Sequence, residues 1–538
     1  MKKKCLSVAL CMSLCLCALI PVNAESSPSL NSLIYNDHGN IINGVLPTDV
    51  SVYESHLNKS PIPYATVAPS VDLSTSIYFP AINDQGDLNA CTAFSTTYYQ
   101  FSFEKNKLLK TPSSGADTWA SPRLTYTFCN HGLNTGISVR DAYQFLEHFG
   151  DLSWTDFPYI GTNLPEYYRT WPTDTDELRD ALSVRLSSWE AYEISSGSNM
   201  ASGLNKVKSV LQSGKVLQMS LYSSDWYIMR SDEYGKILCR NGRLNNSSSS
   251  HSVAVVGYND NVCIDVNGNG KIDAGEKGAF KIANSWGTND YYTNNGYLWI
   301  LYDTLNMTST IPGNWQSQFS SVRCPLASID DEGYPTSSNY FTAITVAQYP
   351  VYMVAEVTYT SDSREAIWCS STKDDNTNNK IEPFLPSTGT SMNGEHYPVA
   401  GTYTAMYDLS PLMKSIETDF TDTDWNTKIE TRDLGKYSIT NISYRITDSF
   451  GRAVTSTHTR SLLNQQNQSI TFRDNVDLII GDVDYSGTIT SSDALTVLQA
   501  ATKKVKLSSL QTFLGDYDRD GSITSNDAQQ ILQNATGG

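Results

Sequence analysis

Cys91 is the residue of this chain best placed to act as a nucleophile. It opens the apolar segment Cys-Thr-Ala-Phe-Ser, which predicts the start of a helix, and Gln85 lies six residues before it. Unpaired backbone N–H groups at a helix N-terminus favour the thiolate over the thiol. The side-chain amide of Gln85 is a donor of the kind that stabilises an oxyanion beside such a nucleophile. The alternative is a buried structural cysteine at the start of a core helix.

Two further residues supply the partners that a catalytic thiolate needs. A histidine can accept the thiol proton and later return it to a leaving amine. Of the seven histidines, His251 alone directly opens a strongly apolar stretch, which predicts a place on a core strand. Asn284 closes another apolar stretch 33 residues later, where it can orient the imidazole. Trp286 can shield that hydrogen bond from water.

Three segments have the twelve-residue spacing of a calcium loop, in which oxygen ligands surround a sharp turn at a glycine. Residues 265–276 fit this pattern at each ligand position, with Gly270 at the turn. An Asn/Gly-rich hairpin without an ion is the alternative. A bound ion is expected to rigidify the insert between His251 and Asn284. The ligand positions of this loop are Asp265, Asn267, Asn269, Lys271, Asp273 and Glu276.

The other two calcium loops form an internal repeat near the end of the sequence, at an offset of 34 residues. Each copy ends in a helical stretch, predicted at 495–501 and 529–535. A loop and one helix are too small to bury a core, so two copies and their ions form one unit of about 60 residues. The ligand positions are Asp482, Asp484, Ser486, Thr488 and Asp493 in the first copy, and Asp516, Asp518, Asp520, Ser522 and Asp527 in the second.

The elements that must hold these residues divide the sequence into domains. Residues 71–325 mix helical and strand-like stretches, which predicts an α+β domain, and residues 326–338 read as a linker. Residues 339–475 show short alternating stretches between turns, which predicts an all-β sandwich. Residues 480–538 form the small all-α calcium-binding domain. In the first domain we expect helices at 94–110, 139–146 and 204–212, and strands at 216–222, 252–258, 279–283 and 297–302.

The start of the sequence has the features of a secretory signal peptide. Three lysines, an apolar run and a small residue at Ala24 predict a leader over residues 1–24. The apolar run is short for a membrane span, and no later stretch is long enough for one. Residues 25–70 are rich in Ser, Asn and Pro, which predicts a polar linker or a short pro-segment. The chain is therefore expected to be secreted.

The composition narrows the possible partners. The net charge is −18, and removal of the leader with its three lysines changes it to −21. An acidic protein of this kind is not suited to bind nucleic acid or an anionic membrane. Six cysteines remain in more than 500 residues, which is too few for a disulfide scaffold. In residues 339–475, Trp368 and Trp425 are candidates for a sugar-stacking platform, and core tryptophans are the alternative.

Four motifs in the same order resemble the papain family of cysteine peptidases, and the match covers residues 71–325. Each motif alone is weak, but four in the right order are hard to obtain by chance. The motifs are Gln85 with Cys91-Thr-Ala-Phe-Ser, His251-Ser-Val-Ala-Val-Val-Gly-Tyr, Asn284-Ser-Trp-Gly and Asn295-Gly-Tyr-Leu-Trp-Ile.

The resemblance implies a role for each candidate residue. Cys91 would be the nucleophile, His251 the general base and acid, and Asn284 the residue that orients the imidazole. Gln85 and the backbone N–H of Cys91 would form the oxyanion hole. Three departures remove no catalytic group: Leu88 where the family often has a cysteine, Thr92 in place of an aromatic residue, and no long helical pro-segment.

The duplicated calcium loops at 480–538 resemble a type I-like dockerin, the module that attaches secreted enzymes to cohesins on a scaffoldin. The resemblance implies two bound Ca²⁺ ions, a cohesin as partner and a cellulosome-like assembly engaged in polysaccharide catabolism. A stand-alone calcium buffer is the alternative. In dockerins, loop places 10 and 11 help to choose the cohesin, and their near-identity here suggests that either repeat can face it. These places are Ser491, Ser492, Ser525 and Asn526.

The sequence therefore predicts a multidomain, secreted cysteine peptidase, endo- or exo-acting, followed by a β-sandwich and a dockerin. Two alternatives remain for the first domain: a catalytically inactive papain-like adaptor of the same assembly, and a papain-like transferase. The sequence assigns no role to the β-sandwich, and carbohydrate binding is one hypothesis for it.

Overall fold

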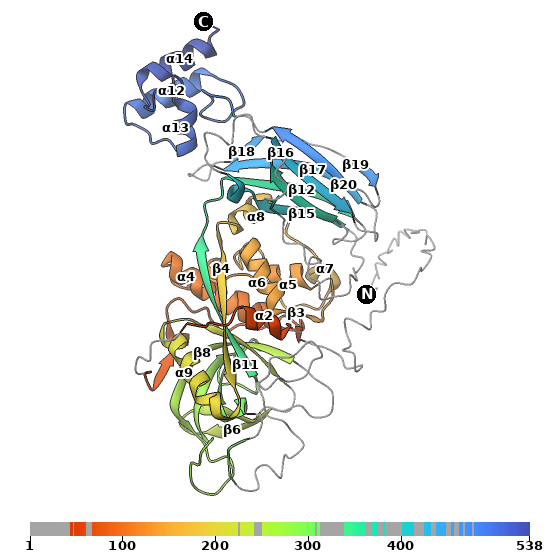
Figure 1. Cartoon of the computed structure of the whole chain (residues 1–538), viewed down its shortest axis with the longest axis vertical. Helices are drawn as coiled ribbons and strands as arrows, with labels where there is room; N and C mark the ends of the chain where they lie inside the picture. The colour runs from red at the N-terminus through yellow and green to blue at the C-terminus, as the bar shows by residue number, and fades with distance from the viewer. Residues whose placement is uncertain are drawn as a thin grey trace, which may run out of the picture.

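The computed structural model in Figure 1 is the basis for the description of the molecule. The signal peptide predicted at 1–24 and nearly all of the linker predicted at 326–338 lie outside the described residues. The described residues are 44–46, 48–60, 67–130, 132–223, 226–240, 250–306, 309–312, 338–361, 367–374, 380–381, 401–413, 424–431, 437–447, 453–456, 462–465, 469–475 and 478–537.

A layer of helices forms one half of the domain that carries Cys91. Helix α3 (Cys91–Ala93) continues into a π-helical stretch (Phe94–Phe101) and then into α4 (Ser102–Leu109). The sequence predicted one helix here, and the structure shows a continuous helix with a π-helical centre. All eight residues of that centre are buried, and four of them are aromatic. The other helices of this layer are α5 (Pro122–Cys129), α6 (Val139–His148), α7 (Pro165–Tyr168) and α8 (Thr175–Ala181).

A nine-stranded sheet forms the other half of this domain. Its central strand β8 (Ser250–Cys263) contacts the π-helical stretch and also helix α9 (Met200–Gln212), so the strand is covered on both faces. This explains its continuous apolar run. The predicted helices at 139–146 and 204–212 and the four predicted strands are confirmed. The order is β4 (Val184–Ser195), β11 (Ser338–Gln348), β5 (Leu217–Tyr222), β8, β9 (Lys277–Ala283), β10 (Tyr297–Leu301), β7 (Gly235–Arg240), β6 (Tyr227–Ser231), and β2 (Ser70–Asp72) pairs with β8.

Strand β11 places the end of the first domain beyond the boundary that was predicted at residue 339. Residues 338–348 pair with β4 along its whole length and also with β5, so they belong to the sheet of the first domain. The same alternating pattern suits any half-buried strand. It does not say which neighbour a strand pairs with, and for that reason the sequence placed this strand in the β-sandwich.

The segment before residue 71 is packed against the first domain in its described parts. Strand β1 (Gly44–Leu46) pairs in parallel with β3 (Gly136–Ser138) and is buried. Helix α2 (Val50–Ser55) follows, and the ring of its Tyr53 stacks on Tyr340 at 4.9 Å. This segment is therefore not the polar linker that the sequence predicted. A few apolar side chains in a polar segment are enough to anchor the segment against the first domain.

The described strands between residues 353 and 475 form two sheets that face each other. Their facing side chains are joined by hydrogen bonds, for example Ser371 Oγ to the Tyr407 hydroxyl at 2.7 Å. Trp425 is fully buried between the sheets, so it is a core residue and not a sugar-stacking platform. One sheet contains β15 (Gly401–Asp408), β12 (Met353–Ser361), β17 (Tyr437–Thr447), β18 (Ala453–Ser456) and β19 (Leu462–Gln465), and the other β14 (Lys380–Ile381), β13 (Ile367–Lys373), β16 (Asp424–Thr431) and β20 (Ser469–Asn475).

The β-sandwich contacts the helical layer of the first domain (Figure 1). Arg185 on β4 forms an ion pair with Asp408 on β15 at 2.8 Å, and both side chains are largely buried. The rings of Trp171 and Tyr403 meet edge to face at 5.1 Å. A buried ion pair holds its partners in one arrangement, because either charge alone would be costly to bury.

Three helices form the C-terminal domain: α12 (Ser491–Ala501), α13 (Ser509–Gly515) and α14 (Ser525–Ala535). The last residue of each predicted calcium loop also lies in the first turn of a helix. Asp493 and Asp527 accept hydrogen bonds from the N-cap residues Thr490 and Thr524, which completes a capping box in each copy. Among the described residues, no helix is both long and apolar enough to cross a membrane.

Candidate active site

Cys91 lies at the first position of α3, as the sequence predicted, and its side chain is 1% exposed. Burial raises the pKa of its thiol to about 11. Hydrogen bonds from the backbone of Ser252 and from Thr92 act in the opposite direction and are weaker. The thiol is therefore neutral at pH 7 in this arrangement.

His251 and Asn284 meet across neighbouring strands. The antiparallel β8–β9 pairing brings Ala254 opposite Ala283, and both candidate residues lie beyond the same end of that pair. The distance from His251 Nε2 to Asn284 Oδ1 is 2.6 Å. The same oxygen accepts the backbone N–H of Ser285 at 2.9 Å, so it acts only as an acceptor and the imidazole must donate. This leaves Nδ1 as the proton acceptor of the neutral ring.

Aromatic rings enclose the imidazole. Trp286 stacks on His251 with ring centroids 4.5 Å apart, and Trp226 lies at 6.3 Å with its edge toward the ring. His251 is 3% exposed. Burial lowers the pKa of His251 to about 4, and the hydrogen bond with Asn284 opposes this shift. Trp286 therefore has the shielding position that the sequence predicted for it.

Gln85 is hydrogen-bonded to Ser285, the residue that follows Asn284. Its Oε1 accepts the hydroxyl of Ser285 at 2.6 Å, and its backbone N–H donates to the Ser285 carbonyl at 2.7 Å. Its Nε2 donates to the Leu88 carbonyl at 2.8 Å, within the loop that leads to Cys91. Gln85 thus contacts both segments that hold the other candidate residues.

The structure brings His251, Asn284 and Gln85 together and places Cys91 against the strand that carries the histidine. The sulfur interacts with the backbone of Ser252, the residue after His251. Between the thiol and the imidazole, which both belong to the described residues, no hydrogen bond is present.

Strand β1 covers the candidate nucleophile, and sequence analysis missed this contact. A Cβ atom built on Gly44 would lie 3.6 Å from Cys91 Sγ and 2.1 Å from the carbonyl oxygen of Ser250. The hydroxyl of Ser250 donates to the Val45 carbonyl at 2.8 Å, and the Val45 N–H donates back at 3.1 Å. The sequence showed only a short apolar stretch, Gly-Val-Leu, in a mostly polar segment. Such a stretch does not indicate which residues it contacts.

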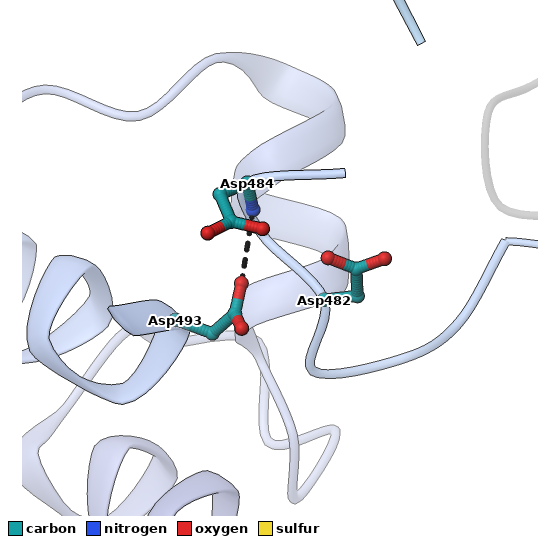
Figure 2. A group of neighbouring side chains, drawn as sticks. All are labelled: Asp482, Asp484 and Asp493. Atoms are coloured by element: carbon teal, nitrogen blue, oxygen red, sulfur yellow. Dashed lines mark hydrogen bonds between the residues drawn. The ribbon is translucent and has the colours of Figure 1, made fainter. Parts of the chain in front are cut away.

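The two C-terminal loops gather carboxylates around a common point. In each loop, one oxygen from each of the three acids lies within 4.8 Å of the other two. Figure 2 shows Asp482, Asp484 and Asp493 of the first copy, with the backbone N–H of Asp484 bonded to Asp493 at 3.0 Å. Hard oxygen ligands on a sharp turn suit Ca²⁺. The second cluster is Asp516, Asp518 and Asp527, and the other predicted ligands of the two loops are Ser486, Thr488, Asp520 and Ser522.

The loop at 265–276 is not one of these three-acid clusters among the described residues, because asparagines occupy two of its ligand places. Its hydrogen bonds nevertheless follow the same scheme as those of the C-terminal loops. Asp265 accepts the backbone N–H of places 5 and 6, as Asp482 and Asp516 do. Glu276 accepts hydrogen bonds from the backbone N–H groups of places 2 and 3, as Asp493 and Asp527 do in their loops.

The predicted partner contacts Ser491, Ser492, Ser525 and Asn526 are exposed. They lie in the first turns of α12 and α14, next to the two clusters. Asn526 also donates to the Asp518 carboxylate at 2.6 Å. The two copies thus present equivalent positions to solvent.

Comparison with known proteins gives two family matches. The model described as papain family cysteine protease matches residues 67–311, and the dockerin type I domain matches residues 480–534. A search of curated proteins found no match. Among solved structures, the chain is similar to xylellain, a cysteine protease from Xylella fastidiosa, with 18% identity and a TM-score of 0.37 over 56% of this chain and 96% of that one. It is also similar to procathepsin B S9 from Trypanosoma congolense, with 15% identity and a TM-score of 0.35 over 57% of this chain and 87% of that one.

Proposed function

We propose that the chain is a secreted cysteine peptidase that docks onto a cohesin-bearing scaffoldin, because residues 67–311 match the papain family cysteine protease model and residues 480–534 match the dockerin type I domain. The observation that carries the catalytic part is the 2.6 Å contact of His251 with Asn284, because it leaves Nδ1 available to a thiol on the adjacent helix. A cellulosome-like assembly is the setting that we propose for it.

The proposed reaction is acyl transfer through Cys91. The thiol proton passes to Nδ1 of His251, and the sulfur attacks the carbonyl carbon of the peptide bond. The Gln85 amide and the backbone N–H of Cys91 donate to the oxyanion. His251 then protonates the leaving amine, which leaves an acyl group on the sulfur. A water molecule, deprotonated by His251, releases the acyl group as a carboxylic acid and restores the thiol.

The covered site supports a latent state of this peptidase. In the described arrangement Cys91 and His251 are both neutral at pH 7, and β1 lies over the sulfur. Exposure to water would lower the pKa of the thiol and raise that of the imidazole, because burial causes both shifts. The alternative of an inactive adaptor would also have a covered cleft, but all four candidate catalytic groups are present.

A thiol-directed epoxide tests the nucleophile. With the full chain carrying Gly44→Ala, which is expected to move β1 away from Cys91, we expect the epoxide to block hydrolysis of a peptide library and to form one adduct, on Cys91, because only an activated thiolate reacts quickly. Peptide mapping by mass spectrometry locates the adduct. Hydrolysis that persists after complete labelling would contradict a thiol mechanism.

The C-terminal domain is proposed to bind two Ca²⁺ ions and a cohesin. The carboxylates of each cluster would repel one another without a cation, and the loops are too short to hold a core alone. The exposed first turns of α12 and α14 are the proposed contact surface, and either copy could occupy it.

We propose a third Ca²⁺ site at 265–276, supported by its hydrogen-bond scheme. Chelation is expected to lower the melting temperature of the peptidase domain by about 5 °C, because an ion bound only to the native state stabilises it. Glu276→Gln should remove this chelation shift, whereas Glu233→Gln, on an exposed turn outside the loop, should keep it. Calorimetry of the full chain measures the shift. An equal shift in the Glu276→Gln variant would argue against an ion in this loop.

A further inference from the structure

A hollow of about 250 Å³ lies beside the candidate catalytic residues, and no step of the proposed reaction uses it. Two antiparallel segments form its walls. The Gly287 N–H donates to the Asn83 carbonyl at 3.3 Å, and two residues further along the Gln85 N–H donates to the Ser285 carbonyl. The hollow therefore begins next to Gln85 and Ser285, the residue after Asn284. Its lining residues are Ile82, Asn83, Asp84, Trp286, Gly287, Thr288 and Asn289.

The hollow lies on the side of the cleft that receives the leaving amine. His251 protonates that amine, and Trp286, which stacks on His251, forms one wall of the hollow. The opposite side of Cys91 is marked by β3 at Gly136–Ser138, where β1 pairs as an extended chain. Substrate residues that follow the scissile bond therefore pass along Trp286.

The only charged side chain in the lining is Asp84. Its Oδ1 accepts the Gly86 N–H at 2.8 Å. Its Oδ2 lies close to Gly287, because a Cβ atom built on that glycine would be 2.9 Å from this oxygen. Within the described residues, Oδ2 accepts no hydrogen bond. An exposed carboxylate oxygen with unused lone pairs is a site for a cationic donor.

The rest of the lining suits a long side chain with an aliphatic stem. Ile82 and the half-buried ring of Trp286 offer apolar surface for the stem, and the face of an indole ring attracts a cation. Lysine and arginine combine these two features, whereas an acidic residue would face the Asp84 carboxylate. A neutral aliphatic residue would leave that carboxylate without a partner.

We propose that Asp84 selects substrates with lysine or arginine at the first or second residue after the scissile bond. This specificity rests on the proposed peptidase function of the same site. Asp84 binds substrate and takes no part in bond breaking.

Fluorogenic peptides with one constant acyl side and Lys, Arg, Gln, Leu or Glu at these two positions test the proposal. The full chain and its Gly44→Ala variant, in which the added Cβ would meet the Ser250 carbonyl and is expected to displace β1, are both assayed. We expect basic peptides to have a kcat/KM about fivefold to tenfold above the matched Gln peptides at low salt, because exposed charge pairs contribute modestly. Asp84→Asn should reduce this ratio to about one, and Asp84→Lys should shift the preference to Glu.

Asp87→Asn is the matched control, since Asp87 is an exposed carboxylate three residues along the same loop that does not line the hollow. It should keep the wild-type ratio. A basic preference that survives Asp84→Asn, or peptides cut without any basic preference, would overturn the assignment while leaving the peptidase function intact. Failure of both chains to cut any peptide would overturn the peptidase function and this inference with it.

Discussion

Replacing Gly44 by alanine is expected to raise the peptidase activity of the full chain by about tenfold or more, because the added Cβ would clash where β1 covers Cys91. Gly44 has a φ of +98°, which L-residues rarely adopt. Its added Cβ would lie 2.1 Å from the Ser250 carbonyl oxygen, and a backbone atom on a core strand cannot move away easily. Strand β1 should therefore leave the cleft.

Gly197→Ala is the matched control for this prediction. Gly197 also has a positive φ, of +82°, but an added Cβ would meet open space. The variant has comparable backbone strain without displacing β1, so its activity should stay at the wild-type level. Initial rates of peptide hydrolysis compare the three chains. Equal rates for wild type and Gly44→Ala would show that β1 does not control access to Cys91.

Displacement of β1 also changes the charges of the site. In the covered state the pKa of Cys91 is about 11 and that of His251 about 4, so at pH 7 neither group is ionised. Once water reaches the site, the thiol pKa should fall and the imidazole pKa should rise. The thiolate–imidazolium pair that the reaction needs can then form near neutral pH.

The positions of the candidate catalytic residues could be predicted because each belongs to a strong local pattern. Cys91 opens a helix, His251 lies on an apolar strand, and Asn284 ends another. The two strands follow each other in the chain and pair antiparallel, so the start of β8 lies beside the end of β9. The internal repeat could also be predicted from the sequence, because its carboxylates follow the spacing that a cation requires.

The contacts of β1 and β11 could not be predicted, since both depend on pairing between distant segments. Residues 338–348 would suit either the β-sandwich or the first sheet by their alternation, and only the register with β4 decides between them. Strand β1 has three residues, too few for any periodic signal. Its glycine became informative only when the structure placed Ser250 and Cys91 beside it.

The second large effect concerns Cys91 itself. Cys91→Ala should lower peptide hydrolysis by a factor on the order of 10⁴ or more, because removal of a nucleophile abolishes the covalent route. Cys263→Ala is the control: this free cysteine is half-buried at the end of β8 and takes no part in the proposed reaction. It should keep most of the activity. Both variants are compared in the Gly44→Ala background, where the cleft is open.

The most direct measurement is the mass of the peptide that contains Cys91 after an acid quench of the reaction with a slowly hydrolysed ester. We expect that peptide to carry the acyl group of the substrate during turnover, and the Cys91→Ala chain to carry none. An acyl group found only on another residue, or hydrolysis that continues at the same rate in Cys91→Ala, would contradict the account.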